Sequence, residues 1–162
     1  MIINNNPGNL RYYGDLWRGL IPRNYYIGEF CRFETMYDGL RAMTIDILGD
    51  IAEGKNTIRK LITEYAPNNE NNTALYIQQI SEWTSIHPDT NLTGWESGQL
   101  NVIYNMIKKE TGQTLPMLFV EKVYDDVIDN IYDPADLEPV VASTKTSLFI
   151  PAAIAAYIIL NN

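Results

Sequence analysis

Five amphipathic segments, separated by helix-breaking residues, constrain the fold of this chain more than any other feature of its sequence. From Tyr37 onward, apolar residues recur every three or four positions, as they do on one face of an α-helix. Asn, Thr, Gly and Pro residues lie between these segments, where they cap or stop helices. The pattern predicts helices over about residues 37–54, 57–66, 73–85, 98–110 and 116–132.

The first 33 residues follow a different pattern, because they are rich in turn-forming and aromatic residues. Two stretches in this region, IGEF at 27–30 and RFET at 32–35, have the length of small strands. No internal repeat is evident. The sequence therefore predicts a mainly α (α+β) fold, with a small β or irregular N-terminal lobe before the helices.

Composition limits the partners and the chemistry. The chain of 162 residues is about one domain long, and its net charge of −8 and pI of about 4.5 provide no basic face for nucleic acid. Cys31 is the only cysteine and His87 the only histidine, which argues against a His/Cys zinc site. His87 precedes a proline, so we expect it in a surface loop. We expect no metal and no cofactor, and a solvated acidic face on the last helix formed by Glu121, Asp125, Asp126 and Asp129.

The chain changes character again after Tyr132. Residues 133–147 contain Asp-Pro and Glu-Pro pairs and predict a linker. Residues 148–162 begin with the uncharged run LFIPAAIAAYIIL and predict an apolar C-terminal helix. Because a membrane-spanning helix needs roughly 20 apolar residues, we expect a core or interfacial helix, with a membrane anchor through residues 148–160 as the alternative. The start of the chain has neither the basic nor the apolar region of a signal peptide.

The opening stretch NNNPGNLRYYGDLWRG, residues 4–19, predicts a tight turn. Pro7 restricts its own φ, Gly8 permits a positive φ, and Asn6 and Asn9 can hydrogen-bond to their own backbone. The same stretch carries amide, guanidinium and aromatic groups, which proteins use to bind sugars. It is either a structural turn alone or one wall of a glycan-binding trough.

Six short motifs follow one another along the first two thirds of the chain. They are NNPGNLRY at 5–12, W-x-G at 17–19, F-x-x-F-x-T at 30–35, G-L-R-A at 39–42, A-P-x-x-E-N-N-T-x-x-Y-I at 66–77 and M-x-x-x-E-x-G at 106–112. In order and spacing they resemble a phage-associated family of lysozyme-like proteins. The resemblance implies a lysozyme-like fold over residues 1–132 that cleaves peptidoglycan, with its segments circularly permuted relative to lytic transglycosylases.

Cleavage of a glycosidic bond needs a carboxylic acid that protonates the leaving oxygen. Glu110 is the first candidate, because it ends a helix in IKKETG and resembles the helix-final glutamate of lytic transglycosylases and bacterial glucosaminidases; the alternative is an exposed helix-end residue. Glu70 is the second, as another carboxylate or a substrate orienter, and its alternative is an acid that favours a helix N-terminus. Glu34, in the RFET stretch, is the third.

The remaining motif residues are candidates for sugar binding. Aromatic side chains stack on sugar rings, amides such as those of Asn71 and Asn72 bind N-acetyl groups, and buried packing is the alternative for the aromatic residues. The candidates are Asn6, Asn9, Arg11, Tyr12, Trp17, Phe33, Thr35, Asn71, Asn72 and Tyr76.

The expected function is that of a lytic transglycosylase or muramidase (lysozyme), which cleaves between N-acetylmuramic acid and N-acetylglucosamine. A single glutamate suffices for transglycosylation, whereas two carboxyls about 5 to 9 Å apart permit hydrolysis. Peptidoglycan glycan strands and virion proteins are the expected partners, in a virion or at the host periplasm and cell wall. The alternative is a catalytically inactive virion structural or cell-wall-binding module with the same fold.

Overall fold

The computed structural model describes residues 2–25, 27–69 and 71–130. Within these residues the protein is mainly helical, with two short 3-10 helices, η1 (Ile3–Asn5) and η2 (Arg23–Tyr25), before five α-helices. The α-helices are α1 (Met36–Ala52), α2 (Ile58–Tyr65), α3 (Thr73–Thr84), α4 (Glu96–Thr111) and α5 (Met117–Asp129). The predicted linker over 133–147, the apolar helix over 148–162 and Glu70 lie outside the described residues.

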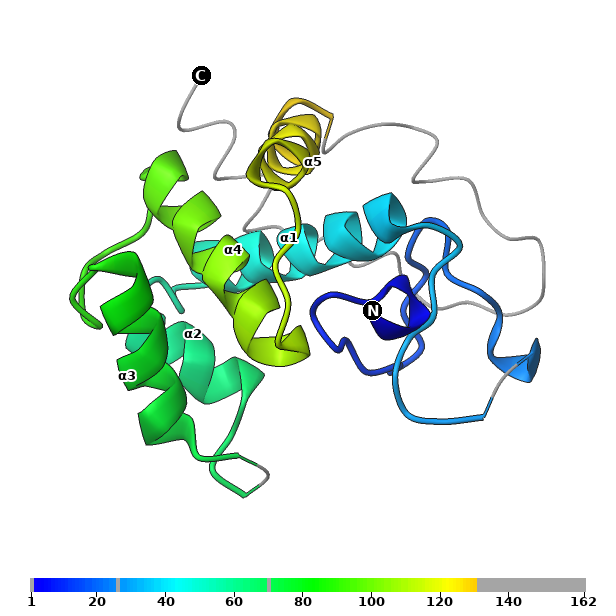
Figure 1. Ribbon diagram of the computed structural model, residues 1–162, viewed down its shortest axis with the longest axis horizontal. Coiled ribbons are helices and arrows are strands. Elements are labelled where there is room, and N and C mark those ends of the chain that lie inside the picture. Colours follow the sequence, from blue (N-terminus) through cyan, green and yellow to red (C-terminus); the bar gives the residue numbers. More distant parts are fainter. Residues whose placement is uncertain (1, 26, 70, 131–162) are drawn as a thin grey trace.

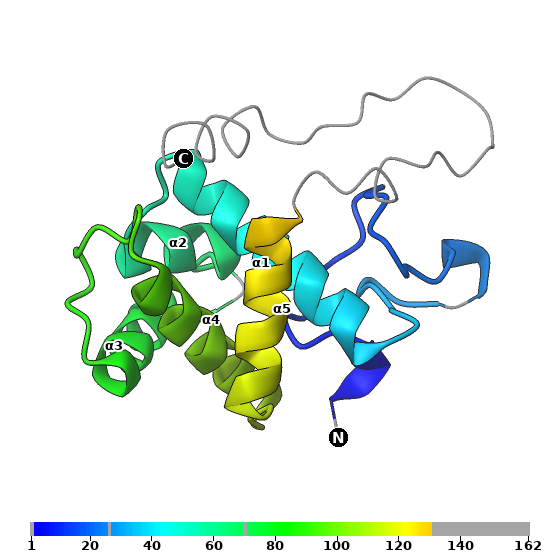
Figure 2. The ribbon, with the colours of Figure 1, turned by 90° about the horizontal axis from the view of Figure 1, so that it is seen from above.

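Helix α1 lies at the centre of the molecule. It packs against α5, α4, α2 and η1, while α3 packs against both α2 and α4 (Figure 1). Helix α5 crosses α1 on one side, and the N-terminal segment lies beside the start of α1 (Figure 2). The largest fully buried side chains come from the helices, from the N-terminal segment and from the loop before α4: Phe33, Leu40, Met43, Ile47, Ile58, Leu61, Ile62, Ile80, Leu92, Ile103, Met106 and Ile107. No helix among the described residues is long and apolar enough to cross a membrane.

The predicted helix boundaries are confirmed to within a few residues, and the predicted caps explain them. The Thr57 hydroxyl accepts the N–H of Lys60 at 3.2 Å, and the Asn72 side chain accepts the N–H of Leu75 at 3.1 Å. Gly112 ends α4 in the left-handed conformation, with φ of 67°. These contacts supply partners for helix-end groups that have none within the helix.

Thr35, a predicted sugar contact, is the N-cap of α1. Its hydroxyl accepts the N–H of Asp38 at 3.1 Å and donates to the Asp38 carboxylate. We expect Thr35→Ala to lower the free energy of unfolding by about 1 kcal/mol, because the cap is lost, and Thr35→Ser to restore most of it. Urea unfolding measures the difference. A sugar contact alone would leave the stability of both variants unchanged.

The predicted small strands are wrong for the described residues. IGEF and RFET contribute only isolated bridges, Arg11 to Phe30 and Leu20 to Phe33. At RFET, the physical reason is that an asparagine side chain takes two of the carbonyls that a ladder would use. The Asn5 amide donates to the carbonyls of Phe33 and Glu34, each at 3.0 Å. The N-terminal lobe is therefore irregular.

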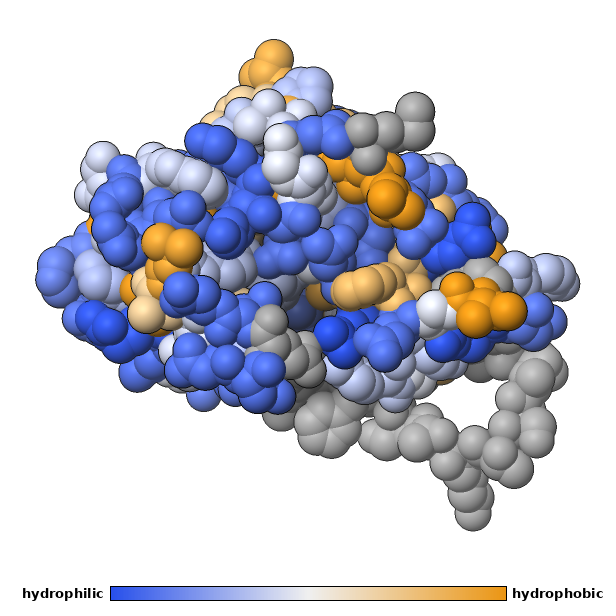
Figure 3. All heavy atoms as spheres, turned by 60° about the horizontal axis from the view of Figure 1, so that its bottom comes forward, coloured by the Kyte–Doolittle hydropathy of each residue, from blue (hydrophilic) through white to orange (hydrophobic). Residues whose placement is uncertain are grey.

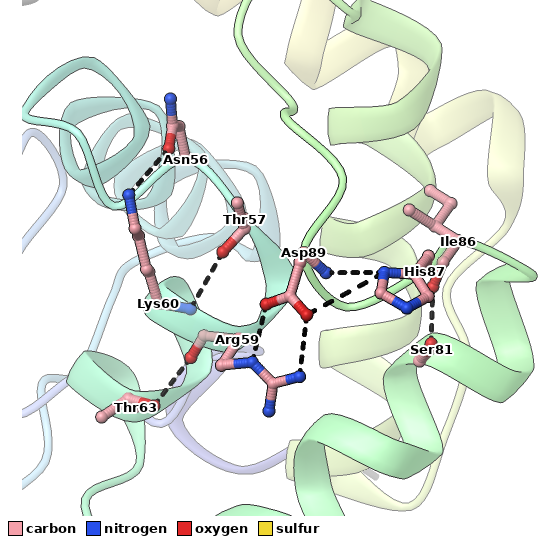
Figure 4. A network of polar contacts seen from close by, with 9 residues as sticks. All are labelled: Asn56, Thr57, Arg59, Lys60, Thr63, Ser81, Ile86, His87 and Asp89. Carbon is pink, nitrogen blue, oxygen red and sulfur yellow. Dashed lines mark hydrogen bonds and ion pairs between the residues drawn. The ribbon is translucent and has the colours of Figure 1, made fainter.

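The loop between α3 and α4 is tied to α2 (Figure 4). The Arg59 guanidinium donates to both carboxylate oxygens of Asp89, at 2.7 and 2.9 Å. The main-chain N–H of Arg59 donates to the carbonyl of Pro88 at 2.9 Å. His87 lies in this loop with 74% of its side chain exposed, which confirms the prediction of a surface position.

Asp46, on α1, makes stability depend on pH. Burial, followed by the charges of Asp50 and Asp15, raises the pKa of Asp46 to about 7. Between pH of about 4 and about 7, the folded state therefore holds a proton at Asp46 that the unfolded state has released. The stability that comes from the protonated Asp46 is fully present below pH of about 4 and lost by pH of about 7. The loss is up to about 4 kcal/mol, since one pKa unit corresponds to about 1.4 kcal/mol, and it is smaller where water screens the carboxyl.

We therefore expect Asp46→Asn to be more stable than the wild type at pH 8 and equal to it near pH 4. Urea unfolding at several pH values measures this difference. Asp125→Asn, at an exposed position of α5, is the control and should follow the wild type. A parallel pH dependence of Asp46→Asn and wild type would contradict the prediction.

Candidate active site

The Glu110 side chain, in the last turn of α4, lies between α3 and the N-terminal turn. The Tyr76 hydroxyl of α3 donates to Glu110 Oε1 at 2.7 Å, and the Asn9 amide donates to Glu110 Oε2 at 3.0 Å. The same Asn9 nitrogen donates to the main-chain carbonyl of Glu110, also at 3.0 Å. Three segments that are far apart in the sequence therefore meet at one partly buried carboxyl group.

The charge of Glu110 acts on two tyrosines, Tyr76 and Tyr65. Burial and the charge of Glu110 raise the pKa of Tyr76 well above its usual value, and the same two causes raise the pKa of Tyr65. The Tyr65 hydroxyl donates to the carbonyl of Gly8, next to Asn9. Both hydroxyls keep their protons at neutral pH and act as hydrogen-bond donors.

The Asn6 side chain holds the N-terminal turn in place. Its oxygen accepts the N–H of Leu10 at 2.9 Å, and its nitrogen donates to the carbonyls of Leu10 and Cys31 at 2.9 and 3.0 Å. Asn6 is 2% exposed, so its amide serves the backbone and does not face a ligand. Asn9 follows in the left-handed region, with φ of 50°, which asparagine tolerates better than most residues.

The two lysines before Glu110 lie along α3. Lys109 donates to the Gln79 side chain at 2.7 Å and lies 5.3 Å from the centre of the Tyr76 ring. Lys108 lies 4.0 Å from the centre of the Trp83 ring. Both ammonium groups thus have partners of their own near the site.

Other predicted sugar-binding residues have structural contacts. Arg11 pairs with Glu29 at 2.9 Å, Phe33 is buried in the core, and Asn72 caps α3 as described above. Tyr12 and Trp17 are partly buried against the core. Asn71 is exposed, and its main-chain N–H donates to the carbonyl of Pro67 at 3.1 Å.

The structure brings together one of the predicted acids with two of the predicted binding residues. Glu110, Asn9 and Tyr76 are in direct contact, whereas Glu34 is exposed and bonds through its main chain to Gly19 and Asn5. Glu70 lies outside the described residues. Over residues 2–25, 27–69 and 71–130, no group of three or more His, Cys, Asp or Glu side chains could hold a metal ion.

Sequence reasoning missed Tyr65 as part of this site. The signal was its place on the apolar face of α2, because a tyrosine that packs into a core must still find a partner for its hydroxyl. That partner, the carbonyl of Gly8, comes from a segment 57 residues away, which no local pattern reveals.

In the middle of Figure 1 the end of α4 approaches the N-terminal segment. Figure 3 turns the bottom of that view forward and shows a mostly hydrophilic face with a few apolar patches. No model of a known protein family matches this chain, and no curated protein matches it in sequence.

Proposed function

We propose that this protein is a peptidoglycan-cleaving enzyme of the lytic transglycosylase or muramidase type, with a permuted lysozyme-like fold. The observation that carries the proposal is the contact of Glu110 with Asn9 and Tyr76. It unites the helix-final glutamate with the asparagine-rich turn, the two features that the motif resemblance implies for catalysis and sugar binding. A partly buried carboxyl group held by two neutral hydrogen-bond donors suits a general acid.

The chemistry needs one carboxyl group that gives and then takes a proton. The Glu110 carboxylic acid protonates the glycosidic oxygen as the bond from that oxygen to C1 of the muramic acid breaks, and the electron pair stays on the oxygen. The 6-hydroxyl oxygen of the same sugar then bonds to C1, and its proton returns to Glu110. The product is a 1,6-anhydro sugar. In hydrolysis, water takes the place of the hydroxyl.

The proposed partners are peptidoglycan glycan strands, with virion proteins as carriers of the enzyme to the cell wall. A contact of residues 148–160 with a membrane remains a prediction, since these residues lie outside the described part of the chain. We propose neither a metal-dependent function nor a nucleic-acid-binding one.

A second candidate is a wall-binding or virion structural module without activity. The observation that favours it is that Thr35, Asn6 and Asn72, all predicted to bind sugar, use their side chains to cap helices or hold turns. Such contacts preserve a fold whether or not it is catalytic.

Digestion of purified peptidoglycan with the full chain, followed by mass spectrometry of the soluble products, tests the proposal. Muropeptides with an anhydro end identify a transglycosylase, and products heavier by one water identify a hydrolase. Binding to sacculi without soluble products would establish the inactive module and overturn the enzyme.

A further inference from the structure

The two oxygens of the Glu110 carboxyl group have different surroundings. Oε1 accepts the hydroxyl of Tyr76, a residue only 3% exposed on α3. Oε2 accepts the amide of Asn9, an exposed residue of the N-terminal turn. One oxygen therefore faces the interior, and the other faces the exposed N-terminal turn.

We propose that Oε2 is the oxygen that exchanges the proton with the glycan. Tyr76 holds Oε1 and Asn9 holds Oε2, so both act as positioning residues for the Glu110 carboxyl group. This assignment rests on the proposed function. It changes the predicted role of Tyr76 from a sugar contact to a residue that acts through Glu110, because a side chain so deeply buried offers no face for a sugar ring.

Tyr76 is suited to hold one oxygen permanently. Its hydroxyl keeps its proton at neutral pH, since burial and the Glu110 charge both raise the pKa of Tyr76. It therefore donates to Oε1 in either protonation state of the carboxyl group. The ammonium group of Lys109 lies over its ring, which keeps the ring between α3 and α4.

Asn9 is suited to hold the other oxygen in place. Its nitrogen donates both to Oε2 and to the main-chain carbonyl of Glu110, each at 3.0 Å. The bond to the carbonyl fixes the orientation of the amide, so that its N–H group stays directed at Oε2. The turn that presents Asn9 is held by the Asn6 amide and by the bond from Tyr65 to Gly8.

Steady-state digestion of soluble glycan strands from purified peptidoglycan separates the two roles. We expect Tyr76→Phe to lower kcat by about 100-fold, because a misplaced reacting group costs about this much, and to leave KM unchanged. Asn9→Gly removes the amide but keeps a residue that tolerates the positive φ, and we expect it to lower kcat and to leave KM unchanged as well. Tyr104→Phe, on the same helix as Glu110, is the control and should behave as the wild type.

The opposite pattern, a raised KM with unchanged kcat in Tyr76→Phe, would make Tyr76 a sugar contact and overturn the proposal. A readout that needs no activity is the NMR resonance of the Tyr76 ring carbon that carries the hydroxyl. It should move in Glu110→Gln, while the corresponding carbon of Tyr104 should not. An unmoved Tyr76 resonance in Glu110→Gln overturns the positioning role. If the resonance moves but the wild-type chain releases no products, the contact between Tyr76 and Glu110 is supported and the proposed function is overturned.

Discussion

Glu110→Gln should abolish the release of soluble muropeptides from purified peptidoglycan, with kcat at least about 100-fold below that of the wild type. The amide has nearly the shape of the carboxyl group, but it has no proton to give to the glycosidic oxygen. It also cannot take a proton from the attacking hydroxyl or water. The Tyr76 hydroxyl can still donate to the amide oxygen, so the packing around α3 and α4 should persist.

Glu121→Gln, at an exposed position of α5, is the matched control and should digest peptidoglycan at the wild-type rate. Circular dichroism and thermal unfolding should show both variants to be folded. Full activity in Glu110→Gln would remove Glu110 from the chemistry and make Glu70 and Glu34 the next carboxyls to replace.

Gly39→Ala should be the most destabilising single-methyl substitution in the N-terminal half of the protein. A Cβ at Gly39 would lie 1.7 Å from the carbonyl oxygen of Asn5. Since this oxygen belongs to the backbone of the neighbouring segment, α1 and the N-terminal turn would have to separate. We expect a loss of about 3 kcal/mol in the free energy of unfolding, at the upper end of the usual cost of overpacking. Urea unfolding measures it.

Gly98→Ala is the control for this prediction. A Cβ at Gly98 would meet the ring of Trp95, the nearest atom at 2.4 Å. Because that ring is 40% exposed, it can rotate away, and alanine also favours the helix by up to about 1 kcal/mol over glycine. Gly98→Ala should therefore cost much less than Gly39→Ala. Equal losses would show that the approach of Asn5 to α1 is not what requires glycine at position 39.

The helices could be predicted from the sequence because their signals are local. The apolar spacing from Leu40 to Ile51, the caps at Thr57 and Asn72 and the glycine at 112 act within one or two turns of the chain. The N-terminal strands were predicted wrongly because the competing contacts are not local. The Asn5 amide bonds to carbonyls 28 and 29 residues away, and no pattern within RFET reveals that.

The candidate site likewise combines features that local sequence determines with contacts that only the tertiary structure determines. By itself, the sequence determined the helices, their ends and the chemical types available at Asn9, Tyr76 and Glu110, since propensity and capping depend on near neighbours. Only the tertiary structure decided that the Asn9 amide, 101 residues before Glu110, bonds to its carboxyl group, and that the buried Tyr76 donates to the same carboxyl group. It also decided that the partly buried Tyr65 donates to the carbonyl of Gly8. The physical reason is that the packing of α3 on α4, and of α4 and the N-terminal segment on α1, brings distant polar groups together. Buried polar groups must then find partners wherever the fold places them.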